Sequence, residues 1–197
     1  MNITSQMVKE LRDKTNAGMM DCKKALSETN GDMEKAVDLL RQKGLAVAQK
    51  RADRATSQGV VESYIHAGSK LGVLVEVGCE TDCVAKTDAF IAFARDIAMH
   101  IAASNPVAVT RDDVPADLVA REREIYRAQA LESGKPENIV DKMITGKIDK
   151  FLAEVCLMEQ KFVKNPDLSV QDLLNELIGK MGENISIKRF ARFQIGG

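Results

Sequence analysis

The sequence is poor in aromatic residues and carries almost no net charge. It has no tryptophan, aromatic residues make up 4% of the chain, and 28 Lys and Arg residues stand against 29 Asp and Glu residues. Bulk binding of nucleic acid requires a basic excess, and stacking of single-stranded bases requires aromatic platforms. The composition therefore argues against direct binding of nucleic acid.

Long apolar runs and an N-terminal signal are also missing. No stretch approaches the roughly 20 apolar residues of a membrane-spanning helix. The N-terminus, MNITSQMVKELRDK, lacks a basic start followed by an apolar segment. The four cysteines are scattered along the chain, at Cys22, Cys79, Cys83 and Cys156. We expect a cytoplasmic protein with reduced thiols and no membrane segment.

What the sequence does contain is the composition of an ordinary globular protein, 45% hydrophobic and 29% charged. Its 197 residues fit one large domain or two small ones. Residues 1–44 have the pattern of three short helices. In the third, Asp32 is a plausible N-cap and Gly44 is expected to end the helix. Because such short helices are unstable alone, we expect a compact bundle over 1–44, then a linker over 45–58.

Residues 59–197 carry strand and helix patterns in separate segments. The runs GVVESYIH and LGVLVEVG flank the turn-rich AGSK and predict a β-hairpin, in which Val73, Val75 and Val77 line one buried face. The final run, NISIKRFARFQI, predicts a strand whose alternation slips near Lys188, which indicates a bulge. Segregated strands and helices predict an α+β core with a small antiparallel sheet.

Helical patterns fill the space between the hairpin and the final strand. The strongest lies in DAFIAFARDIAMHIAA, where apolar residues recur at helical spacing. A charged helix near 116–133 and a second helical region from Pro136 to about Glu159 are expected to pair as an antiparallel helical hairpin. Ser169 is expected to cap a last helix with one apolar face.

Motifs for catalysis or nucleotide binding are not found. The two histidines, His66 and His100, have no neighbouring nucleophile motif and are interpreted as structural or surface residues. The three Gly-Lys pairs begin at Gly134, Gly146 and Gly179, and none completes a phosphate-binding loop. We therefore expect no catalytic residue, no metal site, no cofactor and no covalent chemistry.

The segment CETDCVAK, residues 79–86, admits several interpretations. A metal site is disfavoured because Cys79 and Cys83 have no second pair of ligands. A thiol enzyme that uses the same two cysteines would need a reactive thiolate, and no basic group immediately flanks either sulfur. Two readings of a turn remain: either Thr81 or Asp82 simply caps the next helix, or Asp82 is exposed on a rigid loop that disturbs a partner.

Two adjacent methionines, Met19 and Met20, begin the second predicted helix. Consecutive helical positions differ by about 100°, so both side chains cannot point into one small core. Either one is exposed, where a flexible thioether suits protein contact, or both tuck against the edge of the bundle.

Three segments resemble the elongation factor Ts family, the nucleotide exchange factors for elongation factor Tu. LRDKTNAGMMDCKKAL, residues 11–26, resembles the N-terminal signature, and YIHAGSKLGVLVEVGCETDCVAK, residues 64–86, resembles the second signature. The run SVQDLLNELIGKMGENISIKRFARFQIG is similar to the C-terminal part of the family. The resemblance implies the short form of the family, with a ubiquitin-associated-like helical domain and one α+β core over 59–197.

The resemblance also implies a function and its contact residues. The chain is expected to bind GDP-bound elongation factor Tu and to promote GDP release, so that GTP can rebind. Arg12, Met19 and Met20 match positions that contact the nucleotide-binding domain of elongation factor Tu. His66 lies in a segment that resembles another contact region.

The loop of the second signature is expected to act on the magnesium site of the partner. Thr81, Asp82, Cys83 and Val84 match the family loop that intrudes between helices of that domain and dislodges the Mg²⁺ beside GDP. The family loop commonly reads T-D-F-V, so Cys83 stands in place of an aromatic residue. A cysteine buries less area than an aromatic residue, so the contact of this loop with the partner is predicted to be weaker by about 1–2 kcal/mol.

Short forms of this family are often homodimers, so we expect self-association through the core. The alternative to an exchange factor is a ubiquitin-associated-like binding module on an α+β scaffold, which would bind its partner without changing nucleotide release.

Overall fold

The computed structural model describes residues 3–15, 17–132, 134 and 136–196. It divides into two compact units. The first unit consists of Met1–Met99 with Gln171–Gly197, and the second consists of His100–Val170. The boundary between them falls inside helix α5, Asp88–Ser104.

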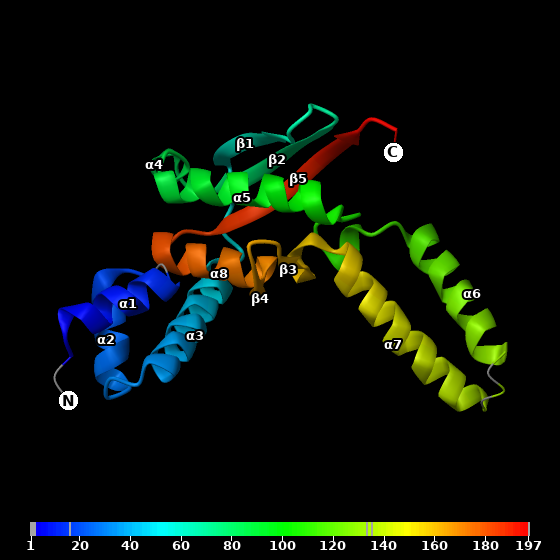
Figure 1. The fold of residues 1–197 in the computed structure, drawn as a ribbon, viewed down its shortest axis with the longest axis horizontal. Helices are drawn as coiled ribbons and strands as arrows, with labels where there is room; N and C mark the ends of the chain where they lie inside the picture. The colour runs from blue at the N-terminus through cyan, green and yellow to red at the C-terminus, as the bar shows by residue number, and fades with distance from the viewer. Residues whose placement is uncertain (1–2, 16, 133, 135, 197) are drawn as a thin grey trace. The chain divides into compact units, whose positions relative to one another are not determined.

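The chain begins with the three predicted helices, α1 (Ser5–Thr15), α2 (Met19–Glu28) and α3 (Met33–Arg51) (Figure 1). Their common core consists of Val8, Leu11, Cys22, Ala25, Leu26 and Ala36. Asp32 caps α3 as predicted, since its carboxylate accepts a hydrogen bond from the Lys35 N–H at 3.1 Å. Asn30 and Gly31, with φ of 53° and 82°, form the turn before it.

Helix α3 does not end at Gly44, so that prediction is wrong. The helix continues to Arg51 and takes up half of the predicted linker. Gly44 serves close packing instead: a Cβ at this position would lie 3.3 Å from the Asn175 carbonyl oxygen of helix α8 (Val170–Met181), and a Cβ at Gly179 would lie 3.1 Å from the Gly44 Cα. The domain boundaries 1–44, 45–58 and 59–197 stay predictions.

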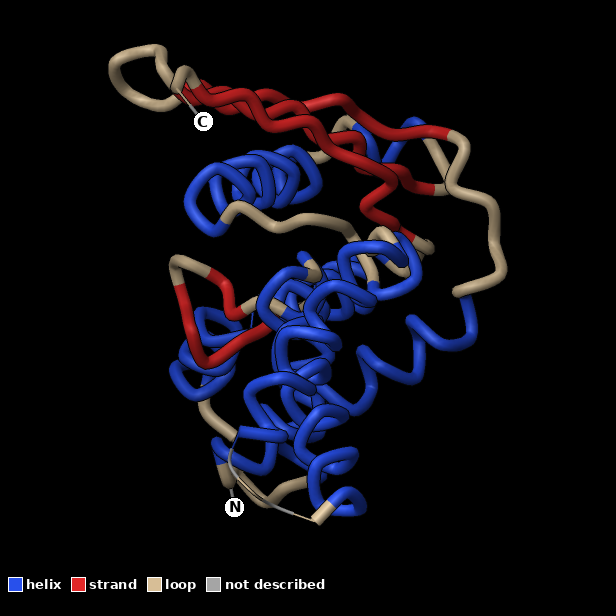
Figure 2. Tube along the Cα trace, turned by 90° about the vertical axis from the view of Figure 1, so that its right-hand side faces the viewer, coloured by secondary structure: helices blue, strands red, loops and turns tan. Residues whose placement is uncertain are grey.

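The first unit contains a three-stranded antiparallel sheet in the order β1-β2-β5, built from Gln58–Ile65, Leu71–Cys79 and Ile185–Gln194. Figure 2 shows the three strands side by side as a twisted ribbon. Val77 pairs with Ile187 whereas Glu76 pairs with Arg189, so Lys188 is an extra residue in β5. The predicted hairpin and the predicted bulge are both confirmed.

Helices cover one face of this sheet. The valines at 73, 75 and 77 are buried on that face, as are Phe90, Ala94, Ile97 and Ala98 of α5. Helix α8, Val170–Met181, lies on the other side of α5 from the sheet (Figure 1) and buries Leu174, Leu177 and Ile178. This segregated arrangement confirms the α+β fold class.

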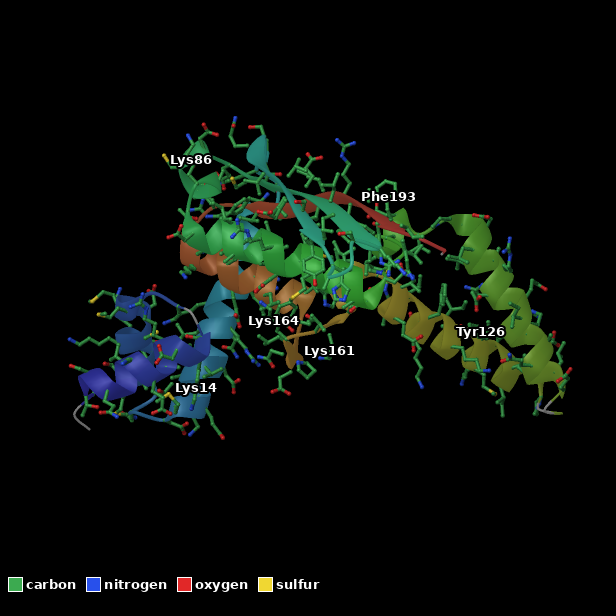
Figure 3. The ribbon with its side chains drawn as sticks, turned by 45° about the horizontal axis from the view of Figure 1, so that its top comes forward. Lys14, Lys86, Tyr126, Lys161, Lys164 and Phe193 are labelled. Atoms are coloured by element: carbon green, nitrogen blue, oxygen red, sulfur yellow. The ribbon has the colours of Figure 1, made fainter. Side chains whose placement is uncertain are left out.

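In the second unit, α6 (Ala116–Glu132) and α7 (Glu137–Val155) form the predicted helical hairpin (Figure 1). They share a small core of Ala130, Val140, Ile144 and Ile148. The Lys147 ammonium lies 5.2 Å from the ring centre of Tyr126, which Figure 3 labels on α6. Pro136 is the N-cap of α7. Ser133, part of the predicted break between the helices, lies outside the described residues.

A second, two-stranded sheet was not predicted. Its strands are β3, Lys161–Phe162, and β4, Asn165–Ser169. They were missed because both are short and β4 is largely polar and contains a proline, which oppose a strand assignment. His100 is buried beside them: its Nδ1 accepts from the Val163 N–H at 3.2 Å and its Nε2 lies 2.9 Å from Gln160 Oε1. This histidine is structural, as predicted.

Candidate partner-contact site

The three predicted N-terminal contact residues line one groove. Arg12 of α1 and Met19 and Met20 of α2 border a cavity of about 510 Å³. Gly18, the N-cap of α2, has extended backbone angles and places both methionines in the first helical turn. Met19 is 59% exposed and Met20 is 62% exposed, so the alternative that both tuck against the bundle is wrong. The groove offers two flexible thioethers beside a guanidinium.

His66 lies in a different place, at the hairpin turn between β1 and β2. Its side chain is exposed, and its Nδ1 lies 2.9 Å from the Tyr64 hydroxyl. The Thr81–Val84 segment follows the other end of β2, because Ile65 pairs with Gly72 whereas Gln58 pairs with Cys79. The structure therefore does not bring His66 to this segment.

The Thr81–Val84 segment forms a tight turn from strand β2 into the short helix α4, Asp82–Ala85. Thr81 is the N-cap, and its hydroxyl accepts from the Val84 N–H at 3.5 Å. Cys79 is buried at the end of the strand, and its thiol donates to the Thr81 carbonyl at 3.2 Å. The two readings of this turn are thus compatible: Thr81 caps a helix, and Asp82 is exposed.

The four predicted loop residues divide by exposure. The Asp82 side chain is 66% exposed and Cys83 is also exposed. Val84 is buried and forms part of the core. Lys86, labelled in Figure 3 beside α4, approaches Asp82 at 3.4 Å, and such an exposed ion pair is weak. Thr81, Asp82 and Cys83 are therefore exposed in this turn, and Val84 is buried.

The base of the turn is held by carboxylates that sequence reasoning missed. The Glu80 carboxylate accepts from the Asn184 N–H at 2.6 Å and pairs with Arg51 at 3.4 Å and Arg54 at 3.2 Å. The hydrogen bond from Asn184, followed by the contact with Arg54, lowers the pKa of Glu80. Glu183 accepts from the Thr81 N–H and hydroxyl at 3.0 and 2.7 Å. No local signal reveals these contacts, because 26 and 29 residues separate Glu80 from the two arginines, and 102 to 104 residues separate the other partners.

Nothing in the described part of the chain forms a reactive centre at this site. Burial raises the pKa of the Cys79 thiol, which opposes formation of a thiolate. Cys83 is exposed and free. The described residues contain no group of three or more His, Cys, Asp or Glu side chains placed to hold a metal ion. Among the described helices, none combines the length and apolar character needed to cross a bilayer.

Exposed methionines beside an arginine, together with a braced and exposed acidic turn, are typical of a protein that binds another protein. The family model described as Elongation factor TS matches residues 1–197. The chain is 72% identical over 196 residues to elongation factor Ts of Desulfotalea psychrophila, with 100% of both chains covered. It is 64% identical over 194 residues to that of Carboxydothermus hydrogenoformans, covering 98% of this chain and 89% of the relative. It is 64% identical over 196 residues to that of Geobacter sulfurreducens, covering 100% and 91%.

The chain belongs to the elongation factor Ts family. Elongation factor Ts is the nucleotide exchange factor for elongation factor Tu. Elongation factor Ts is a cytoplasmic translation factor and performs no covalent chemistry itself.

Proposed function

We propose that this chain accelerates GDP release from elongation factor Tu through two surfaces of its first unit. The groove of Arg12, Met19 and Met20 supplies affinity, and the exposed pair Asp82 and Cys83 disturbs the magnesium and phosphate site of the partner. The observation that carries this proposal is the exposure of Asp82 and Cys83 on a turn whose base is held by hydrogen bonds.

The turn suits this task because it is already ordered. Binding through a mobile loop loses conformational entropy, whereas a braced turn has little left to lose. Thr81 contributes the cap of α4, and buried Val84 anchors the helix to the core. We therefore assign Thr81 and Val84 to the support of the turn, and Asp82 and Cys83 to contact with the partner.

The energetics need no covalent step. The phosphates of GDP are held largely through Mg²⁺ and oriented backbone amides. A protein that binds better when this metal site is disturbed must weaken GDP binding, and GDP must weaken the binding of that protein to the same extent. Each tenfold loss of nucleotide affinity requires about 1.4 kcal/mol of differential binding.

The groove fits the complementary role of holding the complex together. Methionine side chains adapt to an irregular partner surface, and arginine is common in protein interfaces. His66 is exposed at the far end of β2. Its contact with elongation factor Tu is a separate proposal, because it cannot act on the same spot as Asp82.

The test is the release of fluorescent GDP from elongation factor Tu, with excess unlabelled GDP as a chase. We expect a release rate that climbs with the concentration of this protein and then saturates. A rate that stays flat while binding is demonstrated by an independent assay would favour the binding module without exchange activity.

We also propose that the chain forms a homodimer through the outer face of its sheet. Antiparallel sheets commonly keep one face polar, but this face exposes Val61, Ile65, Leu74 and Phe193. Ile65 and Phe193 both pair with Gly72, which has no side chain, so a shallow cavity lies between them. Two copies of such a face can pack on each other about a twofold axis.

The proposed dimer leaves the exchange turn free. Phe193 lies at the opposite end of the sheet from Lys86 and α4 (Figure 3). Self-association and exchange would therefore use different parts of the first unit.

A further inference from the structure

Glu183 lies between helix α8 and strand β5, 102 residues beyond Thr81 in the chain. Its Oε2 accepts from the Thr81 N–H at 3.0 Å, and its Oε1 accepts from the Thr81 hydroxyl at 2.7 Å. Both oxygens of one carboxylate thus bind a single residue, and that residue is the N-cap of α4. Hydrogen bonds to an ionised carboxylate are stronger than those between neutral groups.

The neighbouring residues make the reciprocal contact. Glu80 accepts from the Asn184 N–H at 2.6 Å, so each segment supplies a carboxylate to a backbone N–H of the other. The Asn184 amide also donates to the Arg54 carbonyl oxygen at 2.7 Å. We call Glu80, Thr81, Glu183 and Asn184 the clamp.

The clamp fixes the direction in which the turn points. Because the Thr81 hydroxyl gives its hydrogen to Glu183, its lone pairs are left to accept from the Val84 N–H. The same contacts hold Thr81 in an extended conformation, with φ of −129° and ψ of 152°, immediately before the exposed pair. Helix α4 has only four residues and cannot hold this geometry alone.

We infer that Glu183 is a positioning residue for nucleotide exchange, which acts through Thr81 to aim Asp82 and Cys83 at the partner. The inference rests on the proposed function of the turn. Without Glu183 the complex would still form through the groove of Arg12, Met19 and Met20, but the turn would be correctly aimed for a smaller fraction of the time. The maximal rate of GDP release would fall, and the concentration for half-saturation would change little.

The first experiment compares Glu183→Ala with wild type in the GDP-release assay. We expect the saturating rate to fall about threefold to tenfold, as the competent fraction falls, and the half-saturating concentration to change less than twofold. Glu28→Ala is the matched control, because Glu28 is an exposed carboxylate paired with Lys43 and lies outside the clamp. A saturating rate equal to that of wild type, or an effect on half-saturation alone, would overturn the inference.

A conservative variant separates positioning from direct contact. In Glu183→Gln the amide oxygen can accept from the Thr81 N–H while its NH₂ group donates to the Thr81 hydroxyl, so the clamp is largely retained. We expect at least half of the wild-type saturating rate. If this variant were as slow as Glu183→Ala, the negative charge itself would be what matters, and the positioning role would be rejected.

Amide hydrogen exchange of the isolated protein provides a readout that does not depend on elongation factor Tu. In Glu183→Ala the amides of Thr81 and Val84 should exchange at least about tenfold faster, whereas Glu183→Gln should resemble wild type. If the amide hydrogen exchange rates of Thr81 and Val84 were unchanged in Glu183→Ala, this result alone would contradict the inference that the clamp holds the turn. If wild type failed to accelerate GDP release, the proposed function would fall, and the positioning role with it, while this assay would still report on the clamp.

Discussion

Cys83 is exposed in the Thr81–Val84 turn, where the resemblance to the family leads us to expect an aromatic residue. Because the side chain is outside the core, it can be enlarged without disturbing the fold. We predict that Cys83→Phe raises the rate of GDP release from elongation factor Tu, by up to about tenfold, since phenylalanine buries more area against the partner. Cys83→Ser is the control for loss of the thiol. An unchanged or slower rate would show that the pocket of the partner matches cysteine.

Asp82 supplies the exposed charge of the same turn. We predict that Asp82→Ala lowers the saturating rate of GDP release about tenfold, a loss of about 1.4 kcal/mol of differential binding. Thermal stability should stay the same, because the side chain is exposed and its ion pair with Lys86 is weak. Lys86→Ala removes that ion pair but keeps the Asp82 carboxylate. This variant should promote GDP release at close to the wild-type rate. Equal losses in the two variants would assign the effect to the ion pair.

Glu176 of α8 predicts a dependence of stability on pH. Burial raises its pKa from 4.5 to about 7, while Arg41 opposes the shift and Asp172 adds to it. Between pH 4.5 and about pH 7, Glu176 is protonated in the folded state but has lost its proton in the unfolded state. The contribution of protonated Glu176 to the free energy of unfolding is therefore complete below pH 4.5 and is lost as the pH rises to about 7. Above that range the folded state holds an unfavourable charge.

The measurement compares urea unfolding of Glu176→Gln and wild type at pH 5 and pH 8. We expect the variant to be more stable by about 1–3 kcal/mol at pH 8 and by less at pH 5. Comparison with wild type removes the contribution of other titrating groups. An advantage that does not change with pH would contradict a raised pKa in the folded state.

At the scale of elements, two helical glycines have opposite surroundings. Gly146 lies within α7, and a Cβ there would meet nothing within 4 Å, whereas one at Gly44 would press on α8. Alanine favours a helix by about 1 kcal/mol over glycine. We predict that Gly146→Ala raises the free energy of unfolding by about 0.5–1 kcal/mol. Gly44→Ala should be less stable than Gly146→Ala by about 1 kcal/mol or more, since α3 and α8 must shift apart. Thermal unfolding of the two single variants is the check.

Helices and strands could be predicted where apolar side chains recur at a regular spacing. The valines of β2 and the apolar residues of α5 revealed a strand and a helix, and the slip at Lys188 revealed a bulge. The end of α3 and the short strands β3 and β4 were not predictable. Gly44 looks like a helix end in the sequence, and only the backbone of α8 explains why a glycine stands in mid-helix. Strands β3 and β4 are stabilised by long-range contacts, such as that of His100 with Val163.

At the scale of the whole molecule, the exposed apolar residues on the outer face of the sheet predict a dimer. We predict that Phe193→Glu shifts the protein from dimer to monomer in sedimentation analysis, because it places a charge in the proposed interface. Leu131→Glu is the matched control, since Leu131 is also an exposed apolar residue but lies on α6. If wild type is monomeric at high concentration, or if both variants dissociate equally, this face is not the interface.

The sequence by itself determined the family, the fold class, and the helices and strands with a strong repeat, and it predicted candidate contact residues. These features are local: a periodic pattern, a cap or a signature is complete within a few tens of residues. The tertiary structure decided which of those residues face outward. It exposed both Met19 and Met20, buried Val84, and placed His66 far along the sheet from Asp82. It also brought Glu183 to Thr81, because a hydrogen bond across a hundred residues exists only once β2 and β5 have paired.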